Sequence, residues 1–275
     1  MRKGMRNGLT MLLLLALFAG LGMVARKNMQ AKEDLAAYAE AEKIAKEPDV
    51  PLTELPEEAP AEKPEELSYV WREAPVVDDP YMDVLRETDL AALREVNEDV
   101  IGWIVIPDTK LEYPLMYSGD NAFYLNHTWK KEASSAGSIF LEQYNSPELS
   151  DFNTILYGHR MINGSMFASL KYYNSQEHWE KHPYVYLLDG AGAHRYEIFS
   201  AYEASVVGRT YQLGFADDVE KQTFLDSCVG WSVIDTGVVP TINDRILTLS
   251  TCTGKGYDTR WVVQARLAAD TATQE

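Results

Sequence analysis

Basic residues are scarce in this sequence of 275 residues. Lysine and arginine together number 25 against 42 aspartates and glutamates, which gives a formal net charge of −17 at pH 7. A surface that binds the phosphates of a nucleic acid needs clustered lysine and arginine, so we exclude a nucleic-acid partner. Part of the acidic excess is local, because residues 47–66 contain eight acidic residues, five prolines and one lysine. Such a segment cannot bury apolar area and predicts an extended linker.

Cysteine is equally scarce, with only Cys228 and Cys252 in the chain. In an exported protein two cysteines can form a disulfide, which would leave no free thiol. Cys228 shares a predicted helical face with Phe224 and Leu225, and this favours a small buried side chain. Cys252 follows the strand-like run 245–251 and precedes a loop of small residues. We therefore expect Cys252 to be exposed, as a thiolate nucleophile must be.

Long apolar runs are limited to residues 9–25 (LTMLLLLALFAGLGMVA). This length is at the lower limit for crossing a bilayer and is also long for the core of a signal peptide. Arg2, Lys3 and Arg6 precede the run, so residues 1–8 are expected in the cytoplasm and the rest of the chain outside. No pair of small residues near the end of the run fits a cleavage site. An uncleaved, single-pass signal anchor in the cell membrane is therefore favoured over a cleaved signal.

Residues 26–78 are predicted to form a juxtamembrane helix at 31–47 and then the Pro/Glu-rich linker. A further helix is expected to begin at Asp79-Pro80, since an aspartate cap followed by proline is typical of a helix start. Its apolar stripe, which we expect to pack on the main domain, comprises Met82, Leu85, Leu93 and Val96.

From residue 102 the sequence changes to short β-rich runs separated by turn residues, and it contains no internal repeat. About eight such runs at irregular spacing predict a closed barrel or a sandwich. The expected strands are 103–106, 111–116, 138–141, 154–157, 184–188, 195–204, 246–251 and 261–267. Helical insertions are expected at 121–125, 165–172 and 217–228.

A cysteine nucleophile needs a proton donor for the leaving group, and the chain has five histidines. His178 and His182 have the spacing of a metal-binding pair, but no third ligand is evident, so we expect them on the surface. His194 lies in a predicted hairpin turn and is expected to be solvated, while His127 is expected to line a groove or cap a loop. His159 ends an apolar strand directly behind a glycine, which makes it the best candidate for the proton donor.

Several segments resemble class B sortases, a cysteine transpeptidase family of Gram-positive bacteria. Residues 248–252 (TLSTC) resemble the TLxTC signature of sortases, and Arg260 follows on the next predicted strand. The tripeptide YGH that ends at His159, and the NGSMF that follows it, resemble the histidine segment of class B. Further similar stretches, in the same order along residues 80–267, are NEDVIGWIVIP at 97–107, DNAFYLNH at 120–127 and GSIFLE at 137–142.

The resemblance implies a mostly β catalytic domain over residues 79–270, an eight-stranded sortase-type β-barrel with an N-terminal helix and inserted helices. One of these, from Asp217, lies between the two strands before the cysteine. Cys252 would be the nucleophile, His159 the general acid and base, and Arg260 the stabiliser of the oxyanion. No metal or cofactor is implied. The substrate-binding residues implied are Asn121, Leu125, Ser250 and Thr251.

The function implied is that of a membrane-anchored transpeptidase with its catalytic domain outside the cell. Its partners would be exported proteins that carry a C-terminal sorting motif, and an amine from a peptidoglycan precursor or from a pilin lysine. A pilin polymerase of sortase type is one alternative. A secreted cysteine peptidase that only hydrolyses is another, although no papain-type CGSCW signature is present. A non-enzymatic barrel adhesin would need no thiol at all.

Two features depart from the best-known class B enzymes. The loop between Cys252 and Arg260 is two residues shorter, and Thr253 and Gly254 stand where some members have acidic residues, so this loop offers no assisting carboxylate. The tripeptide at 79–81, DPY, also resembles the lid motif of class C sortases, although an ordinary helix start explains it equally well.

Overall fold

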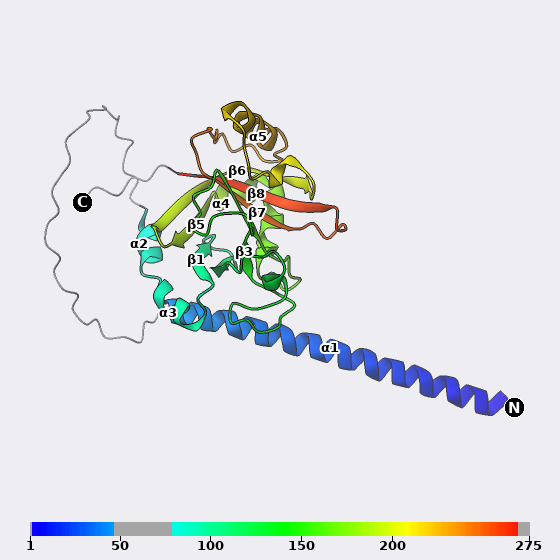
Figure 1. Cartoon of the computed structure of the whole chain (residues 1–275). Coiled ribbons are helices and arrows are strands. Elements are labelled where there is room, and N and C mark those ends of the chain that lie inside the picture. Colours follow the sequence, from blue (N-terminus) through cyan, green and yellow to red (C-terminus); the bar gives the residue numbers. More distant parts are fainter. Residues whose placement is uncertain (1, 47–78, 269–275) are drawn as a thin grey trace, which may run out of the picture.

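A computed structural model describes residues 2–46 and 79–268, and the predicted linker at 47–66 lies outside this part of the chain (Figure 1). Eight strands close into a barrel in the order β1-β2-β3-β4-β7-β8-β6-β5. The strands are β1 (Val100–Val105), β2 (Glu112–Met116), β3 (Ile139–Leu141), β4 (Asn153–Tyr157), β5 (Tyr184–Asp189), β6 (Gly192–Ser205), β7 (Ile246–Cys252) and β8 (Thr259–Leu267). The predicted eight-stranded barrel is thereby confirmed.

The helices are α1 (Arg2–Lys46), α2 (Pro80–Arg86), α3 (Leu90–Val96), α4 (Gln176–Lys181) and α5 (Asp218–Gly230). Three 3₁₀ turns are also present, η1 (Phe123–Leu125), η2 (Phe167–Asn174) and η3 (Arg209–Tyr211). The helix expected from Asp217 is α5, which is inserted between β6 and β7 and carries Asp217 as its N-cap. Its apolar face is buried through Phe224, Leu225 and Cys228.

The helix α1 is continuous and extends away from the barrel toward its N-terminal end (Figure 1). Its last turns dock on the barrel, where Tyr38, Ala41 and Ala45 join the main hydrophobic core. The indole of Trp129 donates a hydrogen bond of 2.8 Å to the carbonyl of Ala37 and fixes this end of the helix.

Among the residues that the structure describes, no helix combines the length and apolar character that a membrane crossing requires. The signal anchor expected at 9–25 therefore has no support from the structure, and it stays a prediction.

The helix expected at Asp79-Pro80 is present but ends sooner than the apolar stripe implied. Asp79 caps α2 by accepting from the backbone N–H of Tyr81, and its carboxylate also accepts a hydrogen bond from Tyr186 of β5. The chain then turns and begins α3 at Leu90. This break shifts the helical phase, so Leu93 is fully buried whereas Val96 is 48% exposed and lies off the stripe.

Candidate active site

Strand register brings the three predicted catalytic residues to one end of the barrel. β4 and β7 are parallel, and Tyr157 pairs with Ser250. His159, two residues beyond Tyr157, therefore lies level with Cys252, two residues beyond Ser250. β7 and β8 are antiparallel, and there Cys252 and Arg260 are direct cross-strand partners.

Gly158 allows the chain to leave β4 in tight contact with the core. A Cβ at this position would lie 2.4 Å from Ile139 Cδ1 and 2.9 Å from the ring of Phe167. The hydroxyl of Thr251 donates a hydrogen bond of 2.7 Å to the carbonyl of Gly158, and the N–H of Phe167 donates one of 3.0 Å to the carbonyl of His159. The backbone that carries His159 is thus held on both sides.

Hydrogen bonding between the neighbouring side chains of His159 and Cys252 moves their two pKa values in opposite directions. The bond to His159 is the main reason that the pKa of Cys252 is lowered; burial opposes this shift, and the charge of Arg260 adds to it. The pKa of His159 is raised chiefly by the same bond, against the effect of burial. Its Nε2 also makes a hydrogen bond of 2.7 Å with the carbonyl of Leu125. This environment favours a thiolate–imidazolium pair.

The guanidinium of Arg260 is half-buried and is held by its own loop. Its Nη1 donates to the carbonyls of Tyr257 and Thr259, each at 2.9 Å. Guanidinium has five N–H donors in a planar fork, so these two bonds leave other donors of Arg260 available beside Cys252.

The four predicted substrate-binding residues divide into two kinds. Leu125 is 43% exposed, and Asn121 is partly buried, with its amide donating a hydrogen bond of 2.7 Å to Glu142 Oε2. Ser250 and Thr251 are each only 2% exposed, and their hydroxyls already bond to Tyr211 and to backbone. Substrate contact by these residues stays a prediction, as do the catalytic roles.

A buried acid near the site received no role from the sequence. Glu142, which ends the GSIFLE stretch, is 6% exposed. It accepts a hydrogen bond of 2.8 Å from Tyr157, whose ring stacks on that of Tyr211 at 6.4 Å. Burial, reinforced by the bond to Glu142, raises the pKa of Tyr157. A lone acid at the end of an apolar strand was the signal in the sequence that could have indicated this network.

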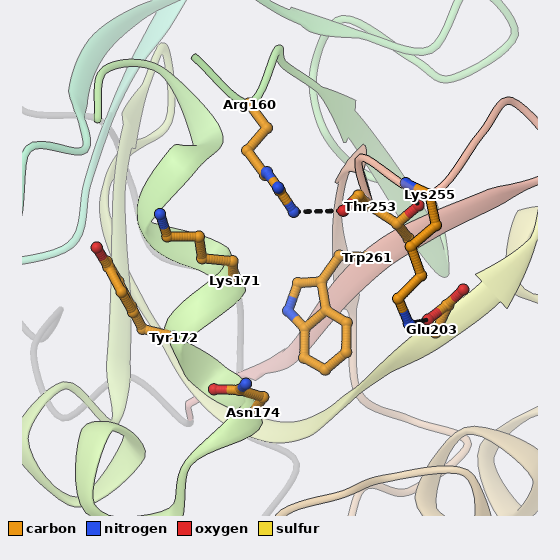
Figure 2. A pocket seen from close by; sticks show the side chains of 8 residues that line it. All are labelled: Arg160, Lys171, Tyr172, Asn174, Glu203, Thr253, Lys255 and Trp261. Atoms are coloured by element: carbon orange, nitrogen blue, oxygen red, sulfur yellow. Dashed lines mark hydrogen bonds and ion pairs between the residues drawn. The ribbon is translucent and has the colours of Figure 1, made fainter. Parts of the chain in front are cut away.

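On the other side of Cys252, the β7–β8 loop borders a pocket of about 390 Å³ (Figure 2). The lining comes from the chain after β4, from η2, from β6 and from the β7–β8 region; its residues are Arg160, Lys171, Tyr172, Asn174, Glu203, Thr253, Lys255 and Trp261. The guanidinium of Arg160 points at Thr253, to whose carbonyl it donates a hydrogen bond, and Lys255 turns toward Glu203 (Figure 2). Sequence reasoning also missed Arg160, although it directly follows the predicted general acid.

Cys228 differs from Cys252 in every respect that governs reactivity. It is fully buried, as the sequence predicted, and burial raises the pKa of its thiol to about 11. Both cysteines are free, so the alternative of a disulfide between them is not realised in this structure.

The remaining four histidines bond or stack with groups other than Cys252. His194 was expected to be solvated, but it is 6% exposed because the hairpin folds it onto Asp189, 3.1 Å away. His178 and His182 were expected on the surface, but they are partly buried, with their rings 4.6 Å apart. His127 stacks on the ring of Phe123 and bonds to the carbonyl of the same residue, in η1. Among the described residues, no group of three or more His, Cys, Asp or Glu is arranged to hold a metal ion.

Comparison with known proteins assigns the family. A model of the sortase domain matches residues 104–268. The chain is 38% identical over 181 residues to sortase B of Listeria monocytogenes, which covers 65% of this chain and 74% of the relative. It is 36% identical over 178 residues to sortase B of Staphylococcus aureus, which covers 64% of this chain and 73% of the relative.

Solved structures agree with these matches. Sortase B of Bacillus anthracis superposes with a TM-score of 0.68 at 30% identity, over 88% of this chain and all of the other. A sortase B–substrate complex from S. aureus gives a TM-score of 0.62 at 35% identity, over 65% of this chain and 83% of the other. With the ordered motifs and the barrel, these likenesses show that the chain belongs to class B of the sortases, a family of cysteine transpeptidases.

Proposed function

We propose that this chain cleaves a Thr-X bond in a C-terminal sorting motif of exported proteins and transfers the acyl group to an amine. The observation that carries the proposal is the strand register, which places His159 level with Cys252 and makes Arg260 its cross-strand partner. In this arrangement His159 lowers the pKa of the thiol, and Cys252 raises that of the imidazole. Because Arg260 is the cross-strand partner of Cys252, its guanidinium is available to the carbonyl oxygen that becomes negative when the sulfur attacks.

In the first half of the proposed reaction, the Cys252 thiolate attacks the threonine carbonyl and forms a C–S bond. Arg260 and the backbone N–H of Thr253 stabilise the negative charge on the carbonyl oxygen. The C–N bond then breaks, the His159 imidazolium protonates the departing amine, and a thioester remains on Cys252.

In the second half, an acceptor amine replaces the departed one. Neutral His159 removes a proton as the amine attacks, and the thiolate leaves as the new amide forms. We favour a peptidoglycan precursor as the acceptor, with a pilin lysine as the alternative. A related solved structure of sortase B complexed with triglycine supports an amine acceptor.

We also propose that residues 9–25 anchor the enzyme in the cell membrane with residues 79–268 outside. The support is the apolar run and the basic residues before it. Protease added to intact cells should release the barrel by cutting within 47–66, because the proline and charge of this sequence predict an extended linker. A mature N-terminus close after residue 25 would contradict the anchor.

The proposed reaction is tested with a library of threonine-containing peptides and a panel of amines. Mass spectrometry should find a thioester on Cys252 and, with amine present, a new amide product. Cys252→Ala should form neither, whereas Cys228→Ala is the matched control and should keep both. A wild-type enzyme that hydrolyses its peptide but transfers nothing to any amine is a cysteine peptidase, and that result would refute the proposal.

A further inference from the structure

Arg160 follows His159 in the chain and reaches the loop on the far side of Cys252. Its Nη1 donates a hydrogen bond to the carbonyl of Thr253, the residue after the cysteine (Figure 2). The backbone of Arg160 is itself fixed by an antiparallel bridge to Met166, which is fully buried. The guanidinium therefore links two anchored parts of the site, the end of β4 and the end of β7.

Thr253 is held from several directions at once. Its side-chain oxygen accepts a hydrogen bond of 3.1 Å from the N–H of Lys255 and lies 3.2 Å from the hydroxyl of Thr259. Arg160, three residues beyond β4, donates the only hydrogen bond among the described residues that the carbonyl of Thr253 accepts from outside this loop. Loss of this contact leaves Thr253 held by its own loop alone.

Gly254 is the residue whose absent side chain makes room for this guanidinium. Its φ is +78°, a left-handed conformation that favours glycine. A Cβ here would lie 2.8 Å from Nη2 and 3.3 Å from Cζ of Arg160. The close approach of Arg160 to the loop thus depends on a glycine at this position.

We propose that Arg160 is a positioning residue that fixes the Thr253–Gly254 peptide, and through it the backbone of Thr253, so that the N–H of Thr253 points at the developing oxyanion. This inference rests on the function proposed above. Arg160 does not touch the reacting atoms in this role. It acts through the carbonyl of Thr253, which lies in the same residue as the donating N–H.

A role as a mere positive charge is the alternative that a test must separate. The groups that act electrostatically on Cys252 are His159, Arg260 and Arg160, and Tyr211 of η3 also faces it. The bond to His159 lowers the pKa of Cys252 most, and the charge of Arg160 contributes less than that of Arg260. In the part of the chain that the structure describes, Arg160 has no carboxylate within ion-pair distance, and the acid of the neighbouring pocket, Glu203, is paired with Lys255 at 2.6 Å.

The first experiment measures kcat and KM for peptide transfer by Arg160→Gln and Arg160→Lys, each at the pH plateau of that variant. Working on the plateau removes the effect of thiol ionisation. Arg160→Gln should lower kcat about 10- to 100-fold, since a misplacement of ~1 Å in a catalytic group can cost ~10²-fold. KM should change less than threefold. Arg160→Lys should recover only part of kcat, because an ammonium lacks the planar fork.

Lys255→Gln is the matched control. It removes one positive charge from the same loop and keeps the backbone N–H that bonds to Thr253, so kcat should stay within about twofold of wild type. The pH profile of iodoacetamide labelling at Cys252 then measures the charge effect alone. The pH midpoint of labelling should rise in Arg160→Gln, which loses the positive charge, and should return to the wild-type value in Arg160→Lys, which keeps it.

The second experiment is a double-mutant cycle. Gly254→Ala should lower kcat in the wild-type background, because the added methyl displaces the guanidinium. In the Arg160→Gln background the same change should cost at least threefold less, since no guanidinium remains to be displaced. Circular dichroism and thermal melting verify that each variant is folded. If Arg160→Gln does not fold, the kcat of Gly254→Ala still tests the proposal, because this change displaces the guanidinium without removing it.

Two results would overturn the proposal. One is an Arg160→Gln enzyme with wild-type kcat on its plateau, which means that Arg160 acts only through charge. The other is a fully additive cycle. If wild type forms no thioester with any peptide, the proposed function itself fails. If the thioester forms normally but substitution of Arg160 does not change kcat, only the positioning role is refuted. The labelling profile can be measured in either case, because it needs no donor peptide.

Discussion

Iodoacetamide should label Cys252 at least ten times faster than Cys228 in the folded protein at pH 7. The thiolate is the reactive form of cysteine, so the comparison starts from its population. The pKa of Cys228 is raised to about 11 by burial, which leaves about one thiolate in 10⁴ at pH 7. The pKa of Cys252 lies below its ordinary value of 9.0, chiefly through the bond to His159, so its thiolate fraction exceeds about one in 10².

Intrinsic nucleophilicity partly offsets this gap of at least 100-fold. A thiolate of lower pKa attacks more slowly, with a Brønsted coefficient of about 0.4–0.5, so two pKa units return roughly 6- to 10-fold to Cys228. The advantage that remains for Cys252 is at least about tenfold. Burial widens it further, because Cys228 is fully buried and reacts only when the structure opens locally.

The assay is timed alkylation followed by quenching, digestion and mass spectrometry of the two cysteine-containing peptides. Unfolding in denaturant should bring the two rates together, which tests whether the fold is the cause. Equal rates in the folded protein would refute the reasoning from burial and hydrogen bonding. Fewer than two free thiols in the non-reduced protein would show a disulfide instead.

Three further predictions follow from the geometry. Arg260→Ala should lower kcat by ~10²–10³ or more while KM moves less, because an oxyanion donor acts in the transition state; Arg260→Lys should recover only a minor part, and near wild-type turnover by Arg260→Ala would show that another group holds the oxyanion. Cys252→Ala should lower the pKa of His159, since the bond to Cys252 is the main cause of its elevation; NMR titration of the ring measures this, and an unchanged value would contradict the thiolate–imidazolium pair. Leu93→Ala should reduce the free energy of unfolding by ~2–5 kcal/mol because it leaves a cavity, whereas the exposed Val96→Ala should stay within ~0.5 kcal/mol; urea denaturation decides, and equal losses would contradict the break between α2 and α3.

The strands were predicted well where apolar runs ended at turn residues. The runs 154–157 and 246–251 differ from β4 and β7 by one residue at one end. β6 begins three residues earlier than predicted, at Gly192, because glycine and alanine carry no strand signal. Sequence spacing could not supply the pairing order, which requires β4 to lie beside β7 across more than 80 residues of chain.

Predictions from the sequence were wrong or incomplete where a residue's burial or role depends on contacts that form only in the folded chain. His194 was expected to be solvated because it follows a small-residue turn, but Asp189 across that turn buries it. The stripe from Met82 to Val96 was treated as one helix because its spacing is helical, although Asp89, the N-cap of α3, is a side chain that indicates a new helix start. Arg160 and Glu142 were missed because their roles depend on partners that only the folded barrel brings near.

A buried polar network explains how the site keeps its alignment. Thr248 is the first residue of TLSTC. Its hydroxyl donates a hydrogen bond of 2.7 Å to Asn153 Oδ1 of β4 and accepts one of 3.0 Å from Gln264 Nε2 of β8. Gln264 Oε1 in turn accepts a hydrogen bond of 3.0 Å from the hydroxyl of Tyr202 on β6. All four side chains are at most 2% exposed, so an unpaired member would be costly.

Three of the strands joined by this network, β4, β7 and β8, carry the catalytic residues at or just beyond their ends. A slip of one residue in β7 would turn every side chain of the strand to the opposite face. Cys252 would then lose its contact with both His159 and Arg260. The same slip would leave Thr248 and Asn153 buried without their partners. The signature TLSTC therefore contains two requirements of different kinds: its cysteine supplies the thiol, and its first threonine fixes the register that places this thiol beside the imidazole.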